Sequence, residues 1–423
     1  MEKSHSKFIE KYQHCGRIVR ANDYSPLQKQ KIMNDSKTHY TSDPYRLFFP
    51  LGILFGLWGT GLWILFYFLK NISYPGLLHP SIMISGFLMI VATGFLMTAI
   101  PRFTNTSHAS SAEKNLALLP ILAQALFLIM GLLPGFQLAS VVSVLFLFRF
   151  GITRIQRSAH FPIPSFVLVG LGLFGFAVGN LLMASASVWN IAPHWQKLAR
   201  LLAFQGLFLG LGLGIGSQLI PSIMGTLKQK PGEPCQPTPL SFETLKRRKI
   251  FFFLGYGLIL WGSFFLEAFI HQQIALFLRA FLITSLLFGK WRIHTRPSVP
   301  GILSWCLWTC SWMLALGYWP GALYPAYSLH GNHIIFIGSL SLMIFAIASR
   351  VTLAHGGYSR EAEKKSIFVT LLLFLMLLAM ATRVSAPWVP NPFSHYAYAS
   401  LLWIVSVLIW GSFFIPKMIL IKK

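Results

Sequence analysis

The sequence has few charged residues, and this scarcity excludes a soluble fold. Charged residues make up 11% of the 423 residues, whereas soluble domains contain about 25%. Hydrophobic residues make up 55%, and their runs are continuous, as in residues 366–382. Only helices and closed barrels satisfy their own backbone polar groups in lipid, and barrel strands alternate polar and apolar residues. The composition therefore predicts an all-α integral membrane protein.

Cysteine is also scarce, and a cleavable leader is not apparent. The four cysteines, Cys15, Cys235, Cys306 and Cys310, fall in two polar segments and one apolar run. This pattern does not indicate a disulfide framework. Residues 1–46 are polar and basic, so we expect the first apolar run to act as an uncleaved signal anchor.

About twelve apolar runs are long enough to be membrane-spanning helices. They lie near 48–69, 79–100, 115–133, 136–152, 163–187, 198–224, 250–270, 272–289, 300–318, 329–349, 366–382 and 396–416. The longest internal polar segment is rich in proline and charge and separates two groups of six. The predicted organisation is a basic tail (1–46), a first six-helix half (47–225), a linker loop (226–249), a second six-helix half (250–416) and a C-terminal segment (417–423).

The positions of the basic residues predict how the helices are oriented. Of the 35 Lys and Arg residues, 30 lie in the N-terminal tail, in or beside the even-numbered loops, or at the C-terminus. The positive-inside rule assigns these segments to the cytoplasm, so both termini are predicted to be cytoplasmic. The net charge of +24 then reflects topology and attraction to anionic membrane lipid and does not indicate a nucleic-acid partner.

Histidines are the main polar feature of the predicted outer side. Neutral imidazole is the commonest metal ligand in proteins and also binds haem iron axially. The predicted outer side holds His79, His194, His271, His330, His333 and His395.

His79, His330 and His333 begin two helices that enter the membrane from the same side. They therefore lie at similar depth, and the spacing of His330 and His333 places these two on one helical face. Two facing helices of this kind could hold a haem between them. The alternative is that these are interfacial histidines bonded to water, headgroups or loop carbonyls.

Two charged residues near the same side could complete a site. Glu267 and His271 are four residues apart, so Glu267 could orient His271 as a metal ligand, or the pair could be a helix cap. Arg279 lies several residues into the eighth span, where a charge needs a partner. We expect that partner to be a haem propionate or Glu267, and a plain buried ion pair is the simpler interpretation.

Three segments carry a family resemblance. Residues 43–51 read DPYRLFFPL, residues 86–104 read GFLMIVATGFLMTAIPRFT, and residues 333–357 end in an Arg350 and a Leu-x-His355-x-Gly pattern. A weaker segment, GSQLIPSIMG, occupies 216–225. Together these segments resemble the NnrS family, the haem- and copper-containing membrane proteins linked to the nitric oxide response.

The resemblance implies a bacterial protein of the cytoplasmic (inner) membrane, with lipid, haem and nitric oxide as partners. It implies haem, which we expect to be of b type, with His79 and His333 as first-choice axial ligands, His330 next, and Arg279 beside the cofactor. His271 and Glu267 complete the candidate metal-binding set. The family commonly has His-x-His-Glu where this chain has His79 followed by Ser81 and Ile82, so copper is less well supported than haem.

Two other classes of function stay open at this stage. The helices also resemble the catalytic subunit of haem-copper oxidases, which would imply nitric oxide reduction. That subunit needs a copper triad from the sixth and seventh helices, and His271 is the only histidine in these two spans. A transporter without haem, with Arg279 on its path, is the other alternative. We therefore assign no catalytic residue and leave enzymatic activity open.

Overall fold

The structure is a computed structural model that describes residues 43–69, 71–158, 163–226, 239–359 and 361–419. Side chains within 239–246 are also outside the described part. Most of the predicted tail, half of the predicted linker and the last four residues therefore lie outside the described residues.

All regular elements of the described residues are helical, as predicted. Several spans combine α-helical segments with π-helical segments, which carry an η label. The elements are α3 (Tyr45–Phe68), α4 (Leu78–Ser81), η2 (Ile82–Leu88), α5 (Met89–Thr104), α6 (Ser111–Ile129), α7 (Leu133–Gln156), α8 (Phe166–Ser185), α9 (Pro193–Arg200), η3 (Leu201–Gly206), α10 (Leu207–Met224), α11 (Pro239–Phe269), α12 (Gln272–Leu286), η4 (Leu287–Trp291), α13 (Ile302–Leu316), α14 (Trp319–Leu323), the 3-10 turn η5 (Pro325–Tyr327), α15 (Ser328–His333), η6 (Ile334–Ser341), α16 (Leu342–His355), α17 (Glu361–Lys364), α18 (Ile367–Val384), the 3-10 turn η7 (Ala386–Trp388) and α19 (Pro392–Ile419).

Eleven helices of the described part are long and apolar enough to cross a membrane. Each of the twelve predicted spans corresponds to a helix. The one that is not among the eleven is α13, which has 15 residues. A helix of this length is about 22 Å long, shorter than the roughly 30 Å hydrocarbon core. The chain is therefore a multi-pass membrane protein.

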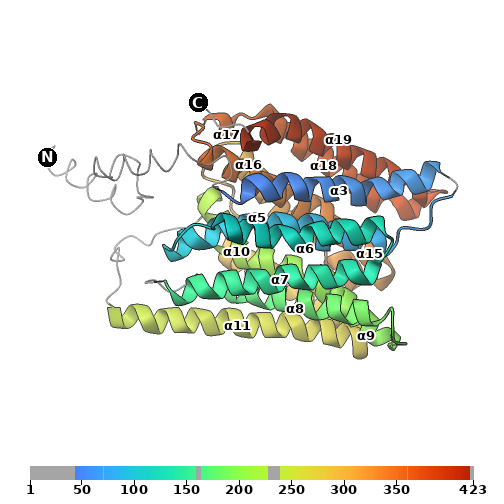
Figure 1. Ribbon diagram of the computed structural model, residues 1–423, viewed down its shortest axis with the longest axis horizontal. Helices are drawn as coiled ribbons and strands as arrows, with labels where there is room; N and C mark the ends of the chain where they lie inside the picture. The colour runs from blue at the N-terminus through green and yellow to red at the C-terminus, as the bar shows by residue number, and fades with distance from the viewer. Residues whose placement is uncertain (1–42, 70, 159–162, 227–238, 360, 420–423) are drawn as a thin grey trace, which may run out of the picture.

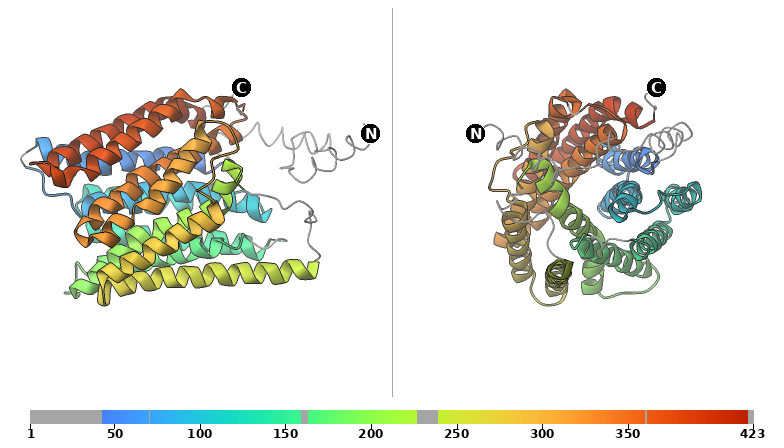
Figure 2. Two further views of the ribbon diagram at one scale, coloured as in Figure 1. Left: turned by 180° about the vertical axis from the view of Figure 1, so that it is seen from behind. Right: turned by 90° about the vertical axis from the view of Figure 1, so that its left-hand side faces the viewer.

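The helices run side by side along one long axis (Figure 1) and form a ring of elements when viewed from the end (Figure 2). The first and last spans, α3 and α19, pack against each other, so the two predicted halves share an interface. We call the end that carries His79 and His333 the histidine end, and the end that carries Arg102 and His355 the arginine end. Their assignment to the outside and the cytoplasm stays a prediction.

Glycines allow α8 and α10 to approach closely. A Cβ atom built on Gly210 would lie 2.5 Å from the Cα atom of Gly172 and 2.6 Å from the carbonyl oxygen of Leu168. Side chains larger than hydrogen cannot fit there, as is common between membrane helices. A Cβ atom on Gly212, two residues away on the same helix, would meet no atom within 4 Å.

We expect Gly210→Val to separate α8 from α10 and to destabilise the protein by about 1–3 kcal/mol, the usual cost of overpacking. Gly212→Val is the matched control, because it adds the same side chain on the same helix where a Cβ atom would meet open space. The midpoint of thermal unfolding in detergent should fall for the first variant and stay near that of the wild type for the second. Equal midpoints would contradict the close packing.

At the arginine end, three separate helix ends meet in one cluster. Arg102 of α5 pairs with Asp43, 3.2 Å between Nη2 and Oδ1, and also contacts the ring of His355. His355 at the end of α16 lies beside the other oxygen of Asp43, at 3.8 Å, and Tyr45 packs edge-on against its ring. All three segments that carry the family resemblance therefore contribute to this cluster, which links α3, α5 and α16.

Asp43 lies just before the first span, and its charge supports this cluster. Burial raises the pKa of Asp43, but the hydrogen bond with His355 and the positive charge of Arg102 outweigh it, so that the pKa lies below its ordinary value. A carboxyl group whose folded-state pKa is depressed stabilises the fold above its unfolded-state pKa, and this contribution is lost as the pH falls through the folded-state pKa.

We therefore expect Asp43→Asn to lower the unfolding midpoint at pH 7, by an amount equivalent to about 0.5–1 kcal/mol for this partly exposed ion pair. The difference from the wild type should shrink as the pH falls below the ordinary carboxyl pKa of about 4 and through the lower folded-state pKa of Asp43. Thermal unfolding at a series of pH values measures this difference in midpoint between the variant and the wild type. A constant difference at every pH would show that the charge of Asp43 is not responsible.

Candidate functional site

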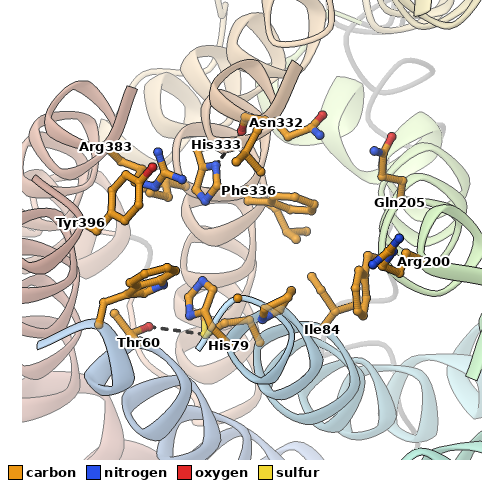
Figure 3. A pocket seen from close by; sticks show the side chains of 18 of the residues that line it. Thr60, His79, Ile84, Arg200, Gln205, Asn332, His333, Phe336, Arg383 and Tyr396 are labelled. Carbon is orange, nitrogen blue, oxygen red and sulfur yellow. Dashed lines mark hydrogen bonds between the residues drawn. The ribbon is translucent and has the colours of Figure 1, made fainter. Parts of the chain in front are cut away.

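A cavity of about 480 Å³ lies toward the histidine end, within the range of about 300–1,000 Å³ typical of ligand sites. Its walls come from α3, α4, η2, α9, η3, α11, α15, η6, α18 and α19, so segments far apart in sequence meet there (Figure 3). Most of the lining is apolar or aromatic. The charged and strongly polar residues that line it include His79, Lys197, Arg200, Gln205, Glu267, Asn332, His333, Arg383 and Tyr396.

His79 and His333 line this cavity together, from opposite walls (Figure 3). Nδ1 of His79 lies 2.9 Å from the carbonyl oxygen of Gly59 in α3. Nδ1 of His333 lies 2.7 Å from the carbonyl oxygen of Leu329, one turn earlier in its own helix. A carbonyl oxygen only accepts hydrogen bonds, so Nδ1–H donates in both rings and Nε2 of each neutral imidazole keeps its lone pair for a ligand.

Aromatic rings hold the two histidines in place. Trp63 of α3 packs edge-on against His79, with ring centres 5.8 Å apart, and against Tyr396 at 4.9 Å. Phe336 packs edge-on against His333 at 6.3 Å. These contacts and the carbonyl bonds fix the orientation of both imidazoles before any ligand is bound, as is usual for metal-binding histidines.

Three π-helical segments form part of the cavity wall. They are η2, η3 and η6, which contribute Phe87, Phe204 and Phe336, among others, to the lining. Two of them directly follow the histidine-bearing segments, since η2 comes after α4 and η6 after α15. A π-helical turn is a local distortion found frequently at functional sites. The presence of three such segments in one cavity wall therefore indicates a functional site, and this argument does not depend on the sequence resemblance.

Arg279 and Glu267 form the buried ion pair that the sequence suggested. Nη1 of Arg279 lies 2.9 Å from Oε2 of Glu267 and 3.0 Å from Oε1 of Gln205, and its side chain is fully buried. Lys197 approaches the other oxygen of Glu267 at 3.7 Å. Glu267 and Gln205 line the cavity, whereas Arg279 lies behind them. Arg279 would therefore act on a bound ligand through these two residues.

The other predicted site residues lie beside the cavity and not in its lining. His271 is exposed and caps the N-terminus of α12 by accepting a bond from the backbone N–H of Ile274, at 3.4 Å, so the structure favours the cap interpretation. His330 contacts the guanidinium group of Arg383, with 3.2 Å between Nη1 and Nδ1. The assignment of His271 and His330 as metal or haem ligands stays a prediction.

Ser81 and Ile82 occupy the positions where the family commonly has histidine and glutamate. The hydroxyl group of Ser81 donates to the carbonyl oxygen of Leu77 at 2.8 Å, and both side chains are buried. Neither lines the cavity, although their neighbours Pro80 and Met83 do. The side chains at these two positions therefore do not form part of the cavity between His79 and His333.

The described residues contain no group of three or more His, Cys, Asp or Glu side chains placed to hold a metal ion. A separate copper ion would need such a group from the protein. Haem iron has a different requirement, because the porphyrin supplies four nitrogen ligands and the protein needs to add only one or two. The cavity walls offer the imidazoles of His79 and His333 for such a role.

Sequence reasoning did not single out Arg383 or Tyr396, which line the cavity next to His333 (Figure 3). Arg383 is one of the five Lys and Arg residues outside the segments that are predicted to be cytoplasmic. Its position was nevertheless a signal, because basic residues are scarce on that side and this one directly follows an apolar run.

Comparison with known proteins places the chain in a family. The family whose sequence model matches the chain is described as NnrS protein, and the match covers residues 39–421. None of the curated proteins compared with the sequence matches it at a significant level. The family match includes every helix described above, and the chain therefore belongs to the NnrS family.

Proposed function

We propose that this protein binds a b-type haem in the cavity between His79 and His333 and acts in the bacterial nitric oxide response. The observation that carries the proposal is the pair of imidazoles on opposite walls of one cavity, each with Nδ1 bonded to a backbone carbonyl. This arrangement leaves the Nε2 atoms of both imidazoles, which would hold the haem iron.

The cavity walls suit a large planar apolar ligand. Aromatic residues from five separate segments face the cavity: Trp63, Phe87, Phe204, Phe336 and Trp403. A porphyrin is mostly apolar, so burying it against such side chains is favourable. The cavity volume also lies in the range for cofactor sites.

Haem would supply a redox-active iron centre; because two imidazoles would fill the positions that the porphyrin leaves open, nitric oxide would coordinate only by displacing one of them. The protein's own contribution would be to orient both imidazoles, to exclude water with aromatic walls and to set the charge around the site. The Glu267–Arg279 ion pair at one side of the cavity is part of that charge distribution. The membership of the NnrS family supports the link to nitric oxide.

We expect the double variant His79→Ala, His333→Ala to purify without the Soret band of the wild-type protein, because both proposed iron ligands are removed. Visible spectra and metal analysis of the purified proteins measure the result. His194→Ala is the control, because His194 is exposed and does not line the cavity. An unchanged Soret band in the double variant would contradict the ligand assignment.

Expression of the wild-type protein in a nitric oxide-sensitive bacterial host should improve growth in the presence of a nitric oxide donor. The double histidine variant should give no improvement when it is produced at the same level in the membrane. Growth rates with and without the donor provide the measurement. A double variant that protects as well as the wild type would separate the haem site from the nitric oxide response.

A further inference from the structure

Arg383 places a positive charge in the wall of the cavity. It lies in the last turn of α18, is only 5% exposed, and faces the cavity close to His333 (Figure 3). A buried arginine needs a partner for its charge, because removing an ion from water is costly unless an opposite charge compensates it. The question is which group provides that compensation.

The neighbours of Arg383 orient its guanidinium group but do not neutralise it. The guanidinium carbon lies 3.9 Å from the centre of the Tyr396 ring, a cation–π contact. Nη1 lies 3.2 Å from Nδ1 of His330. Because arginine only donates hydrogen bonds, Nδ1 of His330 accepts this one, and its ring proton must be on Nε2. Two uncharged rings therefore hold the cation in one position.

Each carboxylate with a described side chain is already paired with another cation. Glu267 lines the same cavity as Arg383, but its carboxylate binds Arg279 and Lys197. The remaining pairs are Asp43 with Arg102, Glu113 with Arg154, Glu361 with Lys364 and Glu363 with Arg350. None of the described acids is left for Arg383.

We propose that Arg383 is the anchor for a carboxylate group of the ligand that occupies the cavity. A planar guanidinium group matches a carboxylate through two parallel hydrogen bonds, and Tyr396 and His330 hold it ready for such a partner. This inference rests on the proposed function, in which the ligand is haem and the carboxylate is one of its propionates. His330 is then a positioning residue for Arg383 and not an iron ligand.

The test compares two ligands that differ only in charge. Haem-free wild-type protein and variants are titrated with haem b and with haem b dimethyl ester, in which both carboxylates are neutral esters. We expect the wild type to bind haem b at least tenfold more tightly than the ester. Arg383→Gln should bind both with similar Kd values and keep the wild-type Soret maximum, because the iron ligands are untouched.

Arg157→Gln is the control. Arg157 is exposed to solvent and does not line the cavity, so its removal should leave the preference for haem b in place. His330→Ala should weaken the preference without changing the Soret maximum, because it loosens Arg383 and does not remove an iron ligand.

The outcomes separate this inference from the proposed function. A wild-type protein that binds haem b and the ester equally well overturns the carboxylate anchor and leaves haem binding intact, and this comparison needs no variant. A preference that survives in Arg383→Gln moves the anchor to another residue and also overturns the assignment. A wild type that binds neither ligand overturns haem binding and this inference with it.

Discussion

The need to compensate every buried charge governs this protein more than any other constraint. The sequence contains 35 basic and 11 acidic residues, and a helical bundle in lipid offers little water to solvate an unpaired ion. Each acid with a described side chain therefore carries an ion pair. Once these pairs are formed, no acid with a described side chain is left for the remaining described cations, which must reach water, lipid headgroups or a ligand. Arg383 is buried beside a cavity, so a ligand is the partner that remains.

A second constraint acts on the histidines. An imidazole on a membrane helix could turn toward lipid, water or the helix interior. It always offers the same nitrogen lone pair to a ligand only when a hydrogen bond fixes its tautomer. Here backbone carbonyls of Gly59 and Leu329 fix Nδ1 of His79 and His333. The π-helical segments that follow both histidines change the helical register over the next residues. Two of the aromatic residues that line the cavity, Phe87 and Phe336, lie in those segments, so the backbone distortion contributes to the shape of the cavity.

The fold and part of the site could be predicted from the sequence. The rest could not be predicted, for physical reasons. Hydropathy and charge depend on local composition, so the helical membrane class and the positions of the spans could be predicted. Several helices extend beyond their predicted spans, as α11 does with 31 residues, whereas α13, with 15 residues, is shorter than its apolar run. The pairing of Arg279 with Glu267 was also predictable, because a buried cation needs an acid and the sequence offers one nearby. In contrast, the carbonyl partners of His79 and the contact between Arg383 and Tyr396 depend on packing between α3, α4, α18 and α19, which has no local sequence signal.

The two ends of the bundle suggest why a divergent chain can keep its site. The segments with the most specific family resemblance meet around Asp43, Arg102 and His355 at the arginine end, where they link three helices. The histidine cavity lies at the other end and depends on His79 and His333, not on the positions of Ser81 and Ile82, which are outside its lining. A porphyrin brings four of its own iron ligands, so the proposed haem site needs only His79 and His333 from the protein. Ser81 and Ile82 therefore bear on the expectation of copper and not on the proposed haem ligands.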